Sequence, residues 1–213
     1  RYYNPAKAFK EVYCLSPREN EEYEAFGMKV IGVDGEKFKS IIKKIKPDVV
    51  RGYGGYWASD FITENRVDNI PVVVSVHDTN PRLMHKSILD ADTVFCMSKV
   101  IKEKILEMGG EESRLKLFSN RVDTNIFYPI KDQTEIDKIR TQFPKGKMLL
   151  HVGRKVTQKN IETVIKALKY LPEDYFTVFV GRGEVEPYSK LAQELSVESR
   201  CFWIQSIENS EMP

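Results

Sequence analysis

The chain has 213 residues, 41% of them hydrophobic and 30% charged, a balance typical of a soluble globular protein. Its formal net charge of +2 gives no indication of nucleic-acid binding, because nucleic-acid-binding proteins usually carry a clear excess of Lys and Arg. Apolar runs such as 72–76 and 148–152 are far shorter than the ~20 residues that cross a bilayer, and no secretory leader is visible, although the chain does not begin with Met.

In the first half of the chain, short β-branched runs alternate with longer amphipathic runs. This pattern predicts strands at residues 12–15, 29–33, 48–51, 71–76, 93–97 and 115–119. It predicts helices at residues 34–45, 56–66 and 99–108. Ser98 is an N-cap for the last of these helices, and Gly109 and Gly110 end it. Because the run 71–76 is apolar apart from Ser75, we expect it to be buried on both faces of a parallel sheet.

The second half repeats the alternation. Helices are predicted at residues 132–143, 161–171 and 187–195, and strands at residues 148–153, 176–181 and 200–204. The order of elements predicts an α/β fold of two Rossmann-like domains with right-handed crossovers. We expect the first domain at 1–128, a linker at 129–146 and the second domain at 147–213. Because the second domain has only about three strands and the first lacks an opening strand with its Gly-rich turn, both are expected to be incomplete.

The most informative segment lies between residues 149 and 160. An apolar strand, expected to be buried, leads to Gly153, Arg154 and Lys159, and Asn160 can cap the helix that follows. Ligands of open parallel sheets bind beyond the carboxyl ends of the strands, where a helix N-terminus offers free N–H groups. Arg grips phosphate with two hydrogen bonds, and Lys adds a compact charge. The segment predicts a site for an anion such as a diphosphate, although any surface loop can also carry an Arg and a Lys.

The surrounding residues carry a resemblance to a known family. Val152-Gly153-Arg154 followed by Lys159-Asn160 resembles the start of the C-terminal domain of family 4 glycosyltransferases, which have the GT-B fold and mostly retain the anomeric configuration. Other positions of the chain match the family in order and approximate spacing. They are Lys46-Pro47-Asp48, residues 71–78, Val122-Asp123-Thr124, Phe127, Ala167-Leu168, Pro172, residues 178–180, Gly181, Gly183 and residues 211–213.

The resemblance implies roles for individual residues. Arg154, Lys159 and Gly153 match positions that bind the donor diphosphate, and Gly181 and Gly183 match a loop on the nucleotide side. As a lone motif, Gly181-x-Gly183 is weak and also fits simple turn glycines. His77 matches a strand-end position near the donor sugar, where it is the candidate catalytic residue; a structural histidine is the alternative.

The implied activity is transfer of a sugar from a nucleoside-diphosphate sugar to a glycan, lipid or small-molecule acceptor, with retention. The donor is a substrate, so no cofactor is expected. No metal is expected either, because no Asp-x-Asp lies between a predicted strand and the loop that follows it, and the three cysteines are widely spaced. The family's acidic motif, two Glu separated by seven residues, is expected beyond residue 213. We therefore expect the chain to be a fragment lacking both ends and to be inactive alone.

Two other functions stay open at this point. One is a different GT-B enzyme, such as a nucleotide-sugar epimerase, which the spacing of Arg154 and Lys159 fits less well. The other is a non-catalytic module that binds nucleotide or carbohydrate, because a fold alone does not decide function. The resemblance implies a cytoplasmic location. The Lys-rich helix at residues 36–46 is compatible with peripheral contact at the inner membrane face, and also with an ordinary solvated surface.

Overall fold

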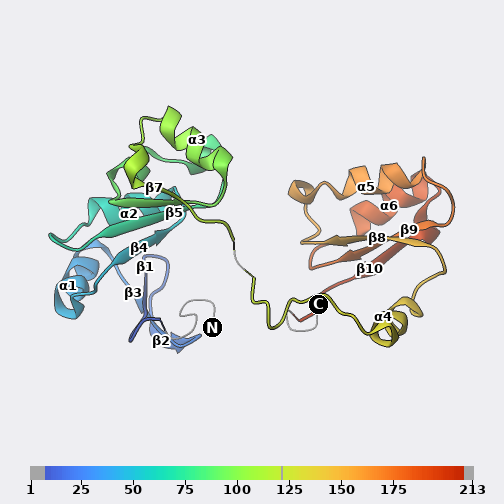
Figure 1. Cartoon of the computed structure of the whole chain (residues 1–213), viewed down its shortest axis with the longest axis horizontal. Helices are drawn as coiled ribbons and strands as arrows, with labels where there is room; N and C mark the ends of the chain where they lie inside the picture. The colour runs from blue at the N-terminus through green and yellow to red at the C-terminus, as the bar shows by residue number, and fades with distance from the viewer. Residues whose placement is uncertain (1–7, 121, 209–213) are drawn as a thin grey trace. The chain divides into compact units, whose positions relative to one another are not determined.

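The computed structural model describes residues 8–120 and 122–208, and the chain divides into two compact units, residues 1–121 and 122–213. Both units are built from helices and mainly parallel strands (Figure 1), which confirms the expected α/β fold. The predicted domain limits at residues 128 and 146 stay a prediction. The outer ends of the two predicted domains, residues 1–7 and 209–213, lie outside the described residues. The positions 211–213 that match the family in sequence therefore lie outside them too.

The main sheet of the first unit has four parallel strands. In spatial order they are β4 (Val50–Tyr53), β5 (Val72–Val76), β6 (Thr93–Cys96) and β7 (Leu115–Leu117). The helices of this unit are α1 (Gly35–Ile45), α2 (Trp57–Glu64) and α3 (Lys99–Glu107). Between β5 and β6 the chain forms two short 3₁₀ turns, η2 (Pro81–Leu83) and η3 (Lys86–Asp90), and a third, η4 (Glu112–Arg114), precedes β7. The sheet therefore presents the carboxyl ends of four parallel strands along one edge.

The core of the first unit forms around β5, as its apolar sequence predicts. Val72, Val74 and Val76 are at most 2% exposed, and Ile88 of η3 and Ile105 of α3 are fully buried with them. These side chains leave water completely, and each such burial contributes about 1.5–3 kcal/mol. The central strand thus fixes where the loop after residue 76 begins.

A second sheet in this unit contains a strand that the sequence did not predict. It consists of β1 (Tyr13–Ser16), β3 (Met28–Gly32) and β2 (Glu22–Ala25), with β1 parallel and β2 antiparallel to β3. Phe26 and Gly27 turn the β2–β3 hairpin with positive φ angles of 54° and 77°. The strand β2 was missed because it has only four residues, two of them Glu, and three of the four are exposed.

The second unit has a three-stranded parallel sheet with β9 in the middle. The strands, in spatial order, are β10 (Cys201–Ile204), β9 (Tyr175–Val180) and β8 (Lys147–Val152). The helices α5 (Ile161–Leu168) and α6 (Glu186–Glu194) cover one face of this sheet, whereas α4 (Gln133–Arg140) precedes β8 (Figure 1). Short 3₁₀ turns, η5 (Thr157–Lys159) and η6 (Glu198–Arg200), precede α5 and β10.

The expectation that the strand before Gly153 is buried is wrong. In the sheet of described strands β8 lies at one edge and pairs with β9 alone. Leu150 is 62% exposed and Val152 is 52% exposed, because both point to the face opposite α5 and α6. An apolar run does not distinguish an edge strand from a central one, so the sequence pattern could not reveal this.

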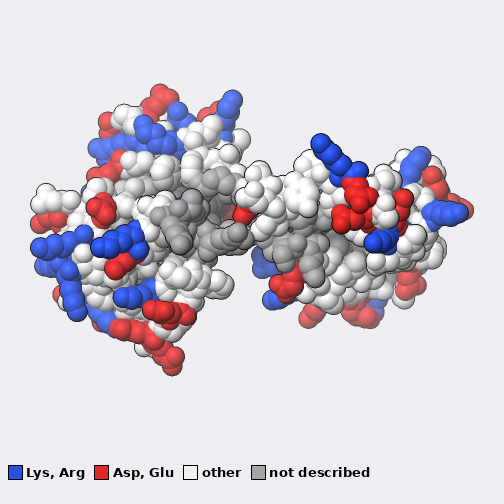
Figure 2. Space-filling view, turned by 60° about the horizontal axis from the view of Figure 1, so that its bottom comes forward, with Lys and Arg blue, Asp and Glu red and all other residues white. Residues whose placement is uncertain are grey.

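Among the residues that the structure describes, no helix is both long enough and apolar enough to cross a membrane. Figure 2 shows Lys and Arg side chains mixed with Asp and Glu side chains over the visible face of each unit. The predicted cytoplasmic location and membrane contact stay predictions.

Asp92 ties three segments of the first unit together and provides a test of this fold. Its carboxylate accepts hydrogen bonds from the Arg66 guanidinium and from the Val72 backbone N–H, each at 2.7 Å. These two bonds, the Arg66 side chain first, hold the pKa of Asp92 below its ordinary value of 3.8. The carboxylate is therefore stabilised more in the folded than in the unfolded state.

We predict that Asp92→Asn lowers the free energy of unfolding of this unit by about 0.5–1 kcal/mol at neutral pH, a small value because Asp92 and Arg66 are partly exposed and screened. Because the folded-state pKa is depressed, the stabilisation is complete above about pH 5 and is lost as the pH falls through the folded-state pKa. Urea unfolding between pH 7 and pH 2 measures it. Asp90→Asn is the matched control, because only the backbone carbonyl of Asp90 bonds to Arg66; equal effects of both variants would contradict the assignment.

Candidate functional site

The loop after β8 carries the two cations that the sequence analysis singled out. β8 ends at Val152, η5 follows, and α5 begins at residue 161. Arg154 and Lys159 are both exposed, and neither forms an ion pair or a side-chain hydrogen bond with any residue that the structure describes. The aliphatic stem of Lys159 lies over Gly153, since a Cβ placed there would be 3.6 Å from Lys159 Cδ. Two cations thus stand at the carboxyl end of β8, available to an anion.

The start of α5 differs from the sequence prediction. Asn160 occupies the N-cap position in a left-handed conformation, with φ of 51°, but its side chain makes no capping bond to the backbone. Its Oδ1 accepts a hydrogen bond of 2.8 Å from the Thr163 hydroxyl instead. The expected capping role of the Asn160 side chain is therefore wrong: the Thr163 N–H donates to the Asn160 backbone carbonyl at 3.3 Å, and the side chain caps no N–H group of the first turn of α5.

The loops after β8 and β9 are held against each other by backbone hydrogen bonds. The Gly153 N–H donates to Val180 O at 2.8 Å, and the Lys155 N–H donates to Arg182 O at 2.7 Å. Gly181 and Gly183 have φ angles of +143° and +130°, which side-chain-bearing residues rarely adopt. A Cβ at Gly181 would collide with Gly153 O, and one at Gly183 would lie 2.6 Å from Lys155 O. These glycines are needed because the two loops approach so closely.

The structure thus brings five of the six predicted site residues to one edge of the sheet in the second unit: Gly153, Arg154, Lys159, Gly181 and Gly183. Lys155, between them, was given no role by the sequence analysis, yet it is 4% exposed. The only sequence signal was a third cation within six residues, and a run of basic residues usually indicates a solvated loop.

His77, the sixth predicted residue, belongs to the first unit and directly follows β5. Its ring packs against that of Tyr53 at the end of β4, with 4.3 Å between the ring centroids and the ring planes tilted by 33°. Its Nε2 is buried and has no hydrogen-bond partner among the described residues. Burial, and secondarily the charge of Arg51, hold the pKa of His77 below its ordinary value of 6.5. The imidazole is therefore mostly neutral at pH 7 and offers a hydrogen-bonding nitrogen that no described residue uses.

Tyr53 and Arg51 complete the surroundings of His77. Arg51 donates from Nε to Ser75 Oγ at 2.8 Å, and its guanidinium lies 5.4 Å from the centroid of the Tyr53 ring. Tyr53 is 64% exposed. An exposed aromatic ring beside a buried polar nitrogen is an arrangement in which the apolar face of a sugar can pack while one hydroxyl finds a partner.

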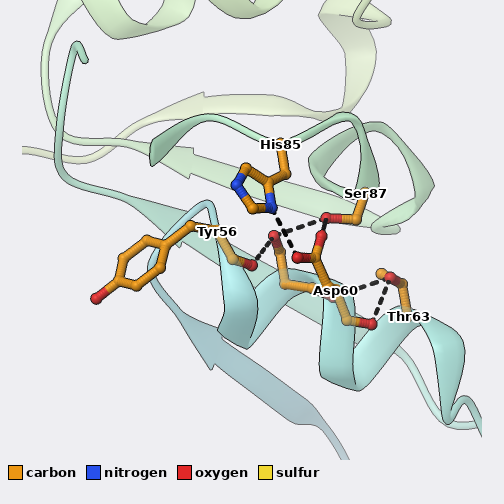
Figure 3. A network of polar contacts seen from close by, with 6 residues as sticks. Tyr56, Asp60, Thr63, His85 and Ser87 are labelled. Atoms are coloured by element: carbon orange, nitrogen blue, oxygen red, sulfur yellow. Dashed lines mark hydrogen bonds and ion pairs between the residues drawn. The ribbon is translucent and has the colours of Figure 1, made fainter. Parts of the chain in front are cut away.

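A polar network that the sequence analysis missed joins α2 to the segment before β6 (Figure 3). The Asp60 carboxylate bonds to His85 Nδ1 at 2.7 Å through Oδ2 and accepts from the Ser87 hydroxyl at 2.6 Å through Oδ1. The His85 N–H also donates to Gly55 O at 2.7 Å. Asp60 lies 25 positions before His85 and 27 positions before Ser87, so the sequence carries no local signal of these contacts. The network anchors the segment that follows His77 onto α2.

Comparisons with known proteins bear on both units. Residues 132–213 match the family model described as glycosyl transferases group 1. None of the curated protein sequences matches the chain. The family match therefore covers the second unit from residue 132, directly before α4, and none of the first unit.

Solved structures resemble the chain over most of its length. The Anabaena protein HepE, solved in complex with UDP, has a TM-score of 0.70 at 18% identity, over 82% of this chain and 52% of HepE. WaaG, a glycosyltransferase involved in lipopolysaccharide biosynthesis, has a TM-score of 0.68 at 15% identity, over 97% of this chain and 65% of WaaG. A Listeria monocytogenes protein provisionally assigned as a UDP-N-acetylglucosamine 2-epimerase has a TM-score of 0.53 at 15% identity, over 83% of this chain and 52% of that protein.

These likenesses show the fold: mixed α/β with parallel sheets, as in GT-B glycosyltransferases. The chain spans about half the length of the Anabaena protein. The glycosyltransferase WaaG and a provisionally assigned epimerase share the fold, so the choice between these two activities rests on the site residues.

The glycines of the two loops give a prediction that separates packing from function. A Cβ at Gly153 meets only the Lys159 stem at ordinary contact distance, and its φ is not positive, whereas a Cβ at Gly181 collides with backbone. We predict that Gly153→Ala changes the free energy of unfolding of the second unit by less than about 0.5 kcal/mol, and that Gly181→Ala lowers it by about 2 kcal/mol or more. Chemical unfolding of both variants measures this. Similar losses in the two variants would show that the loops do not pack as described.

Proposed function

We propose that this protein is a glycosyltransferase that uses a nucleoside-diphosphate sugar as donor. The observation that carries the proposal is the pair of exposed cations, Arg154 and Lys159, at the carboxyl end of β8, without carboxylate partners in the described part of the chain. The match of residues 132–213 to the glycosyl transferase family supports it. The Anabaena structures with UDP and with UDP-glucose support a uridine nucleotide as the first donor to test.

The chemistry explains why two cations are suited to this site. When a glycosyl donor reacts, the bond between the anomeric carbon and the diphosphate oxygen breaks, and its electron pair leaves with the diphosphate. Negative charge on the diphosphate therefore grows towards the transition state. Fixed cations that are already in place stabilise that charge without having to reorganise, so they lower the barrier more than they strengthen ground-state binding.

The backbone geometry contributes in the same direction. Gly153 has room for a Cβ as far as the protein is concerned, so no internal contact requires glycine at that position. A phosphate approaching the backbone N–H groups at the start of α5 would require it, because a side chain would block the approach. We therefore propose that Gly153 is a phosphate-contacting position, whereas Gly181 and Gly183 support it through loop packing.

His77 is proposed to contact a sugar hydroxyl in the first unit. Its buried, unpartnered Nε2 and the adjacent ring of Tyr53 support this role. A neutral imidazole polarises or orients a hydroxyl without adding charge. Transfer with retention, as in family 4, and an acceptor of glycan, lipid or small-molecule type complete the proposal.

The first test is binding of UDP, UMP and uridine to the purified chain by isothermal titration calorimetry. We predict that UDP binds most tightly, and that Arg154→Ala and Lys159→Ala each weaken UDP binding by about tenfold or more, as expected for loss of a charge-assisted hydrogen bond. Turnover with a nucleotide sugar, where it is detectable, falls by about 10²–10³ in each variant.

Lys166→Ala is the matched control, since Lys166 is an exposed lysine in the last turn of α5. It should leave UDP affinity unchanged. If Arg154→Ala and Lys159→Ala bind UDP as tightly as the unaltered chain, the proposed diphosphate site is wrong. Because the chain alone is expected to be inactive, an absence of sugar transfer would not distinguish a transferase from a non-catalytic module, whereas any measurable transfer would exclude the module.

A further inference from the structure

Lys155 is the one charged residue among the buried residues of the described chain. Only 4% of its surface is exposed, whereas its neighbour Arg154 is exposed. No carboxylate pairs with its ammonium group among residues 8–120 and 122–208. Burying a lysine in this way is costly, so its position invites a functional explanation.

The ammonium group lies between the ends of two strands. Lys155 Nζ donates to Gly181 O, at the end of β9, and to Ile204 O, at the end of β10, the latter at 2.9 Å. The Ile204 carbonyl also accepts from the Gly181 N–H at 3.0 Å. The backbone of Lys155 is fixed as well, through its bond to Arg182 O and its bridge to Gly183. The charge is therefore held beneath the loops that carry Gly153, Gly181 and Gly183.

Two carbonyl oxygens compensate this charge only in part. A lysine ammonium has three N–H donors, and the structure gives two of them acceptors among the described residues. Carbonyl dipoles offset a buried charge less well than a carboxylate does. In keeping with this, burial lowers the pKa of Lys155 below its ordinary value of 10.5. An anion bound above the two loops would supply the missing negative charge.

We propose that Lys155 is a third cation of the diphosphate site, acting through space from beneath the loops while Arg154 and Lys159 act from the solvent side. The inference rests on the proposed function, because it takes a nucleoside diphosphate as the ligand. Lys155 is fixed in place before the ligand arrives, so its charge adds to binding without loss of side-chain freedom. The hydrogen bonds from Lys155 Nζ to the Gly181 and Ile204 carbonyls keep the charge at the edge of the sheet.

The alternative is that Lys155 only ties strand ends together. Both roles use the same hydrogen bonds, but they differ in what the ligand does to the lysine. If Lys155 only links the strand ends, binding of a diphosphate leaves its pKa unchanged. A charge that takes part in binding is stabilised by the diphosphate, so its pKa must rise when the ligand is present.

The first experiment measures this in the unaltered chain. The ¹³Cε resonance of Lys155 is followed by NMR from pH 7 to pH 11, with and without saturating UDP. We predict that UDP raises the pKa of Lys155 by about one unit or more, which corresponds to about a tenfold contribution of the charge to affinity. Lys169, exposed just beyond the end of α5, is the internal reference, and its pKa should not move.

Uridine at the same occupancy tests whether the diphosphate is the source of the effect, and it should leave the pKa of Lys155 unchanged. If UDP shifts the amide resonances of Gly153 and Gly181 but not the pKa of Lys155, then Lys155 is a tie only and the inference is wrong, while the proposed function stands. If UDP does not bind at all, both are overturned.

A variant gives the second measurement. Lys155→Met keeps the length of the apolar stem and removes the charge, and replacing a poorly compensated buried charge by an apolar group is often neutral for stability. We predict that it weakens UDP binding about tenfold, whereas Lys169→Met, which removes an equal charge from the opposite end of α5, changes it less than twofold. A folded Lys155→Met chain with unaltered UDP affinity would overturn the inference; if this variant does not fold, the NMR titration of the unaltered chain still decides.

Discussion

The close approach of the loops after β8 and β9 is the constraint on which the candidate site depends. Parallel strands end at the same edge of a sheet, but that alone does not bring their loops into contact. Here the Gly153 and Lys155 N–H groups bond to the β9 side, and Gly181 and Gly183 take φ angles that only glycine adopts readily. As a result, Arg154 and Lys159 leave the sheet edge from a fixed backbone. Fixed cations are what a diphosphate leaving group requires.

Much of the fold could be predicted because the local signals agree with the tertiary structure. Apart from Ser75, the run 71–76 is apolar on both alternating faces, and it forms the central, buried strand β5. Ser98 accepts a hydrogen bond from the Ile101 N–H at 3.2 Å, as expected of an N-cap, and α3 begins there. The candidate residues after β8 were found because a strand end, a glycine and two cations follow one another within a few positions. Periodicity, capping and short-range spacing are properties of neighbouring residues, so one sequence is enough to show them.

The features that escaped prediction depend on residues far apart in the sequence. The contact of Asp60 with His85 joins positions 25 apart, and the burial of Lys155 depends on carbonyls of Gly181 and Ile204. The exposure of Leu150 follows from the place of β8 at the edge of the described sheet, which strand composition does not encode. The surroundings of His77 also depend on a residue far away in the sequence, because Tyr53 of the neighbouring strand covers the His77 ring.

The central claim, that a nucleoside diphosphate binds at the two glycine loops of the second unit, is tested most directly by mapping UDP on the ¹H–¹⁵N NMR spectrum of the whole chain. The account predicts that the largest chemical-shift changes fall on the backbone amides of Gly153, Gly181 and Gly183, and that amides at the far end of α5 change little. Absence of changes at millimolar UDP, or changes confined to residues away from these loops, would contradict it.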